Sequence, residues 1–312
     1  MVAIVALVLT AGALTGASAT AADEGTALTR VSIALFPFDA TSLPFYAKEK
    51  GFFRKEGLDA RITILADPPQ LAAAVLSGSA QFGAASIGGL AILKSRHAPL
   101  RLIAASALYR PRSATTWLMA GKGQHIRGAR DLVGKVVGID GLNSIAHLGL
   151  MHWLRKKGVS PSSVRFQAAP FAETLGPLSR GTIQAAVLPE PFVTLARRGG
   201  ATGVAKIYST VCQKMCLYTG WMARTDLDPS IVARFRRAIE TAAVWADKKS
   251  NRAESGRILV KYTPIDRNVV AKMNRVYFAK RLTALKSGQP WIDLDAEFGL
   301  IPASFPISQL TQ

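Results

Sequence analysis

The residues best placed to do chemistry lie in four short loops, each just before a helical pattern. These loops contain Phe36, Phe38 and Asp39; Ser86, Ile87 and Gly88; Asn143 and Ser144; and Glu190. Free N–H groups and the positive end of the helix dipole make a helix start an anion site, worth about 0.3–1 kcal/mol when exposed. Since such residues also cap helices without any ligand, their repetition after successive strands is what indicates a binding site.

Most of these side chains have a structural alternative. Phe36 and Phe38 are either core residues or the walls of a ligand cleft. Asp39 either caps a turn or faces a ligand amine, and Glu190 either braces a chain crossing or contacts a ligand. Arg110, at a break in the strand and helix rhythm, offers a guanidinium fork to a carboxylate or sulfonate, or else belongs to the solvated surface.

Patterns for catalysis or metal binding are missing from the sequence. It contains no GxSxG, no P-loop, no Ser/His/Asp set at a recognisable spacing and no paired carboxylates in matched loops. The four histidines are scattered without zinc-type spacing, and His147, one turn into a helical pattern, is best interpreted as a packed or surface histidine. We therefore expect a protein that is not an enzyme and needs neither a cofactor nor a metal.

The N-terminus resembles a secretory signal. Val2 to Leu14 is an unbroken run of apolar and small residues, and the Ala-x-Ala patterns that follow are typical of signal peptidase sites. We expect residues 1–21 to be a signal peptide and the mature protein to be periplasmic; a buried first strand or an uncleaved anchor is the alternative. In that oxidising compartment Cys212 and Cys216, the only two cysteines, are expected to form a structural disulfide, the alternative being free thiols.

Composition indicates a globular protein with an unusual charge. Of its residues 49% are hydrophobic and 19% charged, and the formal net charge is +19. The basic residues occur as scattered pairs and triplets, without the long runs or motif spacing of a nucleic-acid-binding protein. We expect no nucleic-acid partner, and a positive field that favours anionic ligands or an anionic membrane surface.

Strand and helix patterns alternate along most of the chain, which predicts parallel or mixed sheets with helices on both faces. This alternation is interrupted at "YRPRSATT" and again near the two cysteines, after which the pattern is mostly helical. The sequence therefore predicts an α/β protein of two lobes joined by two crossings. Lobe 1 is expected to contain residues 28–110 and 212–312, and lobe 2 residues 111–211.

Four blocks of the sequence resemble a known family. They are "LPFYAKEKGFFRKEGLDARITIL", "PQLAAAVLSGSAQFGAASIGGLA", "RDLVGKVVGIDGLNSIAHLGLMHWLRKKGV" and "QAAVLPEPFVTLA". Their sequences and their order along the chain are similar to those of periplasmic substrate-binding proteins of ABC importers, in the branch for aliphatic sulfonates, taurine, nitrate and thiamine precursors. The resemblance implies a two-lobed type II binding fold, a monomer that closes on a small molecule, and delivery to an inner-membrane permease with its ATPase.

The ligand expected from the residues is a small organic acid. Helix starts and a positive field favour a sulfonate or carboxylate, and the two phenylalanines suit an apolar body. Asp39 favours a ligand that also carries an amine or a ring N–H over a bare ion such as nitrate. The alternative from the same resemblance is a protein that binds, or helps to make, the pyrimidine precursor of thiamine.

Overall fold

The computed structural model describes residues 27–66 and 68–312. The predicted signal peptide, residues 1–21, lies outside this part of the chain. Within the described residues no helix combines the length and the apolar character that crossing a bilayer requires.

The first of two large sheets, sheet A, is built mainly from the N-terminal third of the chain. Its strands, in spatial order, are β2 (Leu58–Ile64), β1 (Thr29–Leu35), β3 (Phe82–Ser86), β12 (Thr219–Arg224) and β4 (Leu100–Ala105). β1 is parallel to β2 and β3, whereas β12 returns from far along the chain and is antiparallel to both of its neighbours. The helices of this part are α1 (Leu43–Glu49), α2 (Phe52–Lys55), α3 (Pro68–Leu76) and α4 (Ile87–Ser95).

The second large sheet, sheet C, repeats this plan in the middle of the chain. Its strands, in spatial order, are β10 (Thr202–Ala205), β6 (Thr116–Ala120), β9 (Ala185–Pro189), β7 (Val136–Ile139) and β8 (Arg165–Ala168). Its helices are α5 (Ile145–Lys156), α6 (Phe171–Arg180) and α7 (Phe192–Arg198). β7 is parallel to β8 and β9, and β6 is antiparallel to β9 and β10. The mixed, helix-flanked α/β class predicted from the sequence is confirmed.

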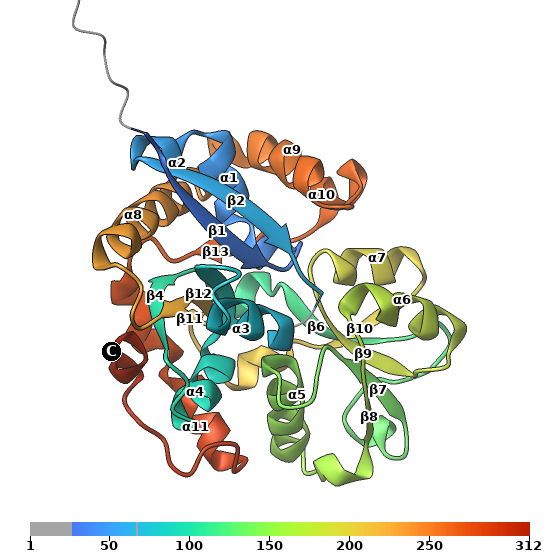
Figure 1. The fold of residues 1–312 in the computed structure, drawn as a ribbon. Helices are drawn as coiled ribbons and strands as arrows, with labels where there is room; N and C mark the ends of the chain where they lie inside the picture. Colours follow the sequence, from blue (N-terminus) through green and yellow to red (C-terminus); the bar gives the residue numbers. More distant parts are fainter. Residues whose placement is uncertain (1–26, 67) are drawn as a thin grey trace, which may run out of the picture.

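A small third sheet lies where the chain passes between the two large ones. It pairs β5 (Ala107–Tyr109) with β11 (Cys216–Leu217) on one side and with β13 (Tyr277–Phe278) on the other. Figure 1 shows β11 and β13 on the side of sheet A, near the chain crossings to the body of sheet C. Cys216 of β11 and Cys212 have Cα atoms 5.6 Å apart and are joined as a disulfide; bridging in the exported protein stays a prediction.

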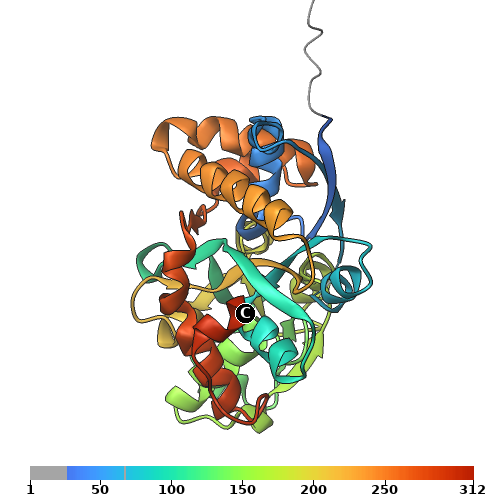
Figure 2. The ribbon, with the colours of Figure 1, turned by 60° about the vertical axis from the view of Figure 1, so that its left-hand side comes forward.

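The C-terminal section is mostly helical, as expected, and returns to sheet A. It contains α8 (Pro229–Ala246), α9 (Arg252–Tyr262), α10 (Arg267–Lys272) and α11 (Gln289–Glu297). α8 and α9 pack near α1 and α2 at one end of the molecule, whereas α11 lies beside α4 (Figures 1 and 2). Phe235 of α8 stacks on Phe82 of β3 with ring centroids 3.8 Å apart, so its amphipathic stripe covers sheet A.

Short 3-10 helices complete the structure. They are η1 (Asp39–Thr41), η2 (Pro111–Ser113), η3 (Arg130–Leu132), η4 (Pro161–Ser163), η5 (Ile207–Thr210), η6 (Lys249–Asn251), η7 (Leu282–Gly288) and η8 (Ile307–Thr311). The segment "VAKIYS" leaves sheet C after Ala205 because Ile207 and Tyr208 turn inward and are buried. The segment "RGARDLVG" contains the single turn of η3.

Candidate functional site

The topology collects the predicted loops at two sheet edges. β1 and β3 are parallel neighbours, so the loop Phe36–Ser42 and the start of α4 lie at the same edge of sheet A. β7 and β9 are parallel neighbours in sheet C, which brings the loop before α5 and the residue Glu190 to one edge as well. The predicted site residues therefore form one group on each sheet, apart from Arg110.

The loop after β1 is anchored by a buried ion pair. Phe36 and Phe38 are half-buried, with ring centroids 5.8 Å apart. Asp39 is fully buried; its Oδ1 accepts from Nε of Arg275 at 2.9 Å and its Oδ2 from the N–H of Val276 at 2.6 Å. Both carboxylate oxygens of Asp39 thus hold the C-terminal section against this loop. The local sequence around Asp39 does not predict this pairing.

The start of α4 is a capped helix end that faces a carboxylate. Ser86 Oγ accepts from the N–H of Gly89 at 3.1 Å, and the N–H of Ile87 donates to the carbonyl of Tyr218 at 3.0 Å. A Cβ atom added to Gly88 would lie 2.9 Å from Oδ2 of Asp295, so the Asp295 carboxylate packs directly against this glycine. Asp295 is fully buried and, within the described residues, its carboxylate oxygens have no hydrogen-bond partner; burial raises its pKa to about 7.

The loop after β7 is closed by a circuit of hydrogen bonds. Ser144 donates from Oγ to Oδ1 of Asp140 at 2.5 Å and accepts at the same oxygen from the N–H of His147 at 3.2 Å. Asn143, in the left-handed region with φ 63°, donates its N–H to Nδ1 of His147 at 3.0 Å. Burial raises the pKa of Asp140 to about 6. The hydroxyl of Ser144 is therefore already engaged, while the exposed side chain of Asn143 projects from the loop.

His147 is packed inside this edge, in line with the interpretation from the sequence. Only 6% of it is exposed, and its ring lies edge-on to Phe166 with centroids 4.5 Å apart. Burial lowers the pKa of His147 to about 4, so the ring is neutral near pH 7. Because Nδ1 accepts a hydrogen bond, the proton of the neutral ring belongs on Nε2.

Glu190 contacts protein groups on two sides. It is 2% exposed, and a cis peptide bond joins it to Pro191. Its Oε2 accepts from the N–H of Thr194 at 3.1 Å and its Oε1 from the N–H of Asn274 at 3.3 Å. Burial raises the pKa of this carboxyl. These contacts match the bracing alternative considered for Glu190, and ligand contact by this residue stays a proposal.

Arg110 lies at the chain crossing rather than at either strand-end edge. Its guanidinium carbon is 4.7 Å from the centroid of the Tyr277 ring, and its side chain is exposed. Stacking on an aromatic face leaves all N–H donors of the guanidinium available to a partner.

An aromatic cluster joins the two edges, and the sequence analysis did not identify it. Tyr208 contacts Trp291, Tyr109 and Tyr218 with ring centroids 5.0, 5.5 and 6.0 Å apart. Gly149 in the middle of α5 is the available sequence signal, because a Cβ there would lie 2.8 Å from the ring of Tyr208. The carbonyl of Tyr218 in turn holds the start of α4, so this cluster spans from sheet C to the sheet A edge.

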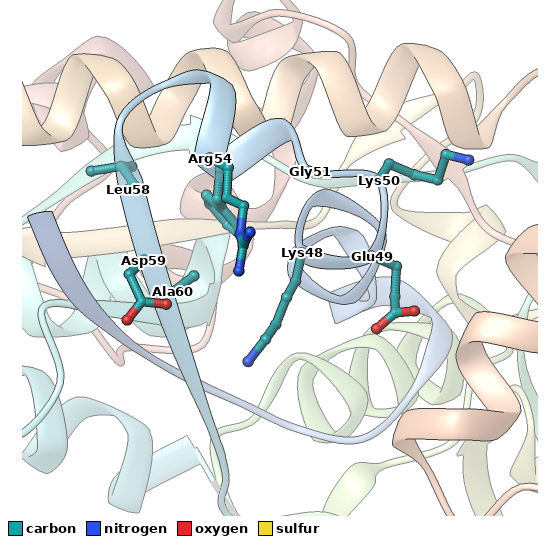
Figure 3. Close-up of a pocket in the computed structure, with 9 residues that line it drawn as sticks. Lys48, Glu49, Lys50, Gly51, Arg54, Leu58, Asp59 and Ala60 are labelled. Carbon is teal, nitrogen blue, oxygen red and sulfur yellow. The ribbon is translucent and has the colours of Figure 1, made fainter. Parts of the chain in front are cut away.

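A surface pocket lies elsewhere, at the far edge of sheet A. It has a volume of about 490 Å³ and is formed by the end of α1, by α2 and by the start of β2 (Figure 3). Two charges on its rim are already paired: Glu49 with Nζ of Lys261 at 2.9 Å, and Lys50 with Glu254 at 2.8 Å. None of the predicted binding residues lines it, so it supplies no part of the candidate site.

Solved structures share this fold at low sequence identity. The alkanesulfonate-binding protein SsuA from Xanthomonas axonopodis pv. citri, bound to MOPS, is 18% identical with a TM-score of 0.72, over 90% of this chain and 97% of that one. The periplasmic nitrate-binding protein NrtA from Synechocystis PCC 6803 is 13% identical with a TM-score of 0.76, over 91% and 85%. The periplasmic aliphatic sulphonate binding protein SsuA from Escherichia coli is 16% identical with a TM-score of 0.69, over 91% and 92%.

These neighbours confirm the type II binding fold, and the expectation of a chain that is not an enzyme agrees with their names, which are those of binding proteins. No curated protein matches the sequence. A family model described as NMT1/THI5 like matches residues 41–253, which is more than half of the chain. The resemblance found in the sequence is confirmed, and the chain belongs to the NMT1/THI5-like family.

Proposed function

We propose that this protein is the exported solute-binding component of an ABC importer. It captures a small organic anion, of the sulfonate or carboxylate type, between the bodies of sheets A and C. It then delivers this ligand to a permease in the inner membrane, driven by an ATPase. The observation that carries the proposal is the placement of the helix-start loops of both sheets at strand ends, in a fold shared with sulfonate- and nitrate-binding proteins.

We further propose how the chain is exported and how it is divided into two lobes. Residues 1–21 direct export to the periplasm, where the mature protein acts as a monomer. Residues 28–110 with 212–312 form one lobe and residues 111–211 the other, and the crossings beside the small sheet serve as the hinge.

The side chains at the strand-end edges of sheets A and C favour an organic ligand over a bare ion. The half-buried rings of Phe36 and Phe38 suit an apolar body. The carboxyl groups of Asp140 and Asp295 lie at or beside helix starts and, when ionised, repel a small anion held there. An acid that also carries an amine or a ring N–H satisfies both features, with Asp140 in the role that the sequence analysis gave to Asp39.

The carboxyl groups of Asp140 and Asp295 also favour one alternative function. A protein for the pyrimidine precursor of thiamine, either in its transport or in its biosynthesis, would need acceptors for ring and amino N–H groups. Asp140 offers such an acceptor, because only one of its oxygens is bound to Ser144.

Calorimetry and thermal-shift measurements with alkanesulfonates, aminoalkanesulfonates, carboxylates, nitrate and aminopyrimidines test these proposals. We expect stabilisation and tight binding by a sulfonate or carboxylate with an apolar body, strongest when an amino group is present. Tight nitrate binding without organic-acid binding would contradict the ligand assignment, and tight aminopyrimidine binding alone would favour the alternative. Turnover of any of these compounds would overturn the role as a binding protein.

A further inference from the structure

The segments that cross between the two sheet bodies, together with the end of α7, carry a group of Lys and Arg side chains. We call their outer face the crossing surface. Its cations are the exposed Arg110, Arg112, Arg197, Lys214 and Lys280 and the half-buried Lys206. Within the described residues none of these six forms a salt bridge, whereas seven other Lys or Arg side chains do.

Two aromatic rings hold most of these cations in place. Tyr277 has Arg110 and Lys280 over its ring, at 4.7 and 5.8 Å from the centroid. Trp117 has Arg197 and Lys206 over its ring, at 5.2 and 5.3 Å. Four of the six cations are therefore held over aromatic faces.

Hydrogen bonds link the two aromatic groups to the same crossing segment. The carbonyl of Ala114 accepts from Nε1 of Trp117 and from Nδ2 of Asn274, both at 3.2 Å, and Asn274 is close in sequence to Tyr277. Lys206 donates from Nζ to the carbonyl of Pro111 at 3.3 Å, next to Arg110. These bonds tie the ring of Trp117 and the strand of Tyr277 to the same crossing segment.

An apolar tip stands beside these cations. Cys216 lies opposite Tyr109 in the antiparallel pairing of β11 with β5, which places Met215 next to Arg110. Met215 is 46% exposed, its neighbour Lys214 is exposed as well, and the Cys212–Cys216 disulfide closes the loop that presents them. The crossing surface thus combines cations that form no salt bridge, amphipathic rings and an exposed thioether.

Three acidic groups lie near the crossing surface. Asp266 is paired with Arg198 at 3.7 Å, whereas the partly or fully buried Asp247 and Glu190 interact electrostatically with Arg110 and Lys280 and with Arg197 respectively. The six cations outnumber these three carboxyl groups, so the local charge is positive, within a chain of net charge +19.

We propose that the crossing surface binds the anionic headgroups of a phospholipid membrane. A membrane attracts each nearby Lys or Arg separately and accepts aromatic rings and an apolar tip at its interface, so it needs no groove on the protein. Such binding keeps the protein on a membrane surface whether or not a solute is bound.

Vesicles of phosphatidylcholine, with and without phosphatidylglycerol, test the proposal in a co-sedimentation assay of the full mature chain. We expect binding only to the vesicles that contain phosphatidylglycerol, with release as salt is raised. The variant Arg112→Gln, Arg197→Gln, Lys206→Gln, Lys280→Gln should weaken binding at least about tenfold. The control Arg54→Gln, Lys55→Gln, Arg96→Gln, Lys135→Gln loses the same charge from exposed positions elsewhere and should stay within about threefold of the unmodified protein.

A second variant covers the case in which the first does not fold. Lys214→Gln with Met215→Gln changes only the exposed loop tip and should weaken vesicle binding at least about threefold, with an unchanged thermal unfolding curve. Equal losses in the crossing-surface and control variants would overturn the proposal, because net charge alone would then explain binding. So would full binding by the loop-tip variant, absence of binding to phosphatidylglycerol, or binding to polyglutamate but not to vesicles, which would indicate an acidic protein partner.

Discussion

At the scale of single residues, the buried pair between Asp39 and Arg275 joins segments that are far apart in sequence. Asp39→Ala would leave the Arg275 guanidinium buried without its partner, and Tyr46, which bonds the same guanidinium at 2.6 Å, cannot neutralise it. We expect the free energy of unfolding in urea to fall by about 3–5 kcal/mol. The matched control Glu254→Ala breaks a more exposed pair with Lys50 and should cost less than about 1 kcal/mol. Equal losses would contradict a special role for Asp39.

The loop before α5 allows binding and folding to be separated. Asn143→Ala with Ser144→Ala should weaken binding of an organic acid by about 1–3 kcal/mol in calorimetry. Because Ser144 also caps α5, stability should fall by about 1 kcal/mol. Asp228→Ala removes the cap of α8 and should lower stability to a similar extent without changing affinity. Full affinity in the double variant would remove this loop from the site.

The carboxyl group of Asp295 makes stability depend on pH. Burial raises its pKa to about 7, above the ordinary value of about 4. Its favourable contribution is therefore complete below about pH 4 and is lost as pH rises through 7, where the folded state must ionise a buried group. Asp295→Asn cannot ionise, so at pH 8 we expect it to be more stable than the unmodified protein by more than about 1 kcal/mol.

At pH 5 the difference between Asp295→Asn and the unmodified protein should shrink, because the carboxyl is then neutral in the folded state. Asp59→Asn, at an exposed position, serves as the control and should show no such dependence. Urea unfolding at both pH values provides the measurement. A pH-independent difference for Asp295→Asn would show that the carboxyl is not buried in a neutral form.

At the scale of elements, the segment between η5 and β11 depends on the two cysteines. Replacing both with serine should lower stability by no more than about 2 kcal/mol, since a bridge across so short a loop constrains little unfolded-chain entropy. Thiol labelling of unreduced, denatured protein checks the bridge directly. Modification of both cysteines under those conditions would reject it.

At the scale of the whole molecule, the proposed function requires the two sheet bodies to move. They are joined by the crossings beside the small sheet, so closure on a ligand should proceed as a hinge motion. We expect solution scattering to show a smaller radius of gyration once a true ligand saturates the protein. An unchanged radius at saturation would count against a closing cleft.

The sequence by itself determined the order of strands and helices, the α/β class, the family and the four loops at helix starts. These features follow from local hydrophobic periodicity, from Gly and Pro at the ends of elements and from the residues of contiguous sequence blocks. All three signals involve residues that are close together along the chain. The buried residues of α8 recur with the helical period for the same local reason.

Only the tertiary structure decided which partner each polar loop residue meets. Asp39 binds Arg275, Gly88 faces Asp295 and Glu190 meets Asn274, and in each pair the second residue comes from the C-terminal section. β12 is likewise inserted into sheet A between strands that precede it by more than a hundred residues. Such pairings depend on how the C-terminal section packs against sheet A. The local sequence around each residue does not indicate which distant residue it will contact.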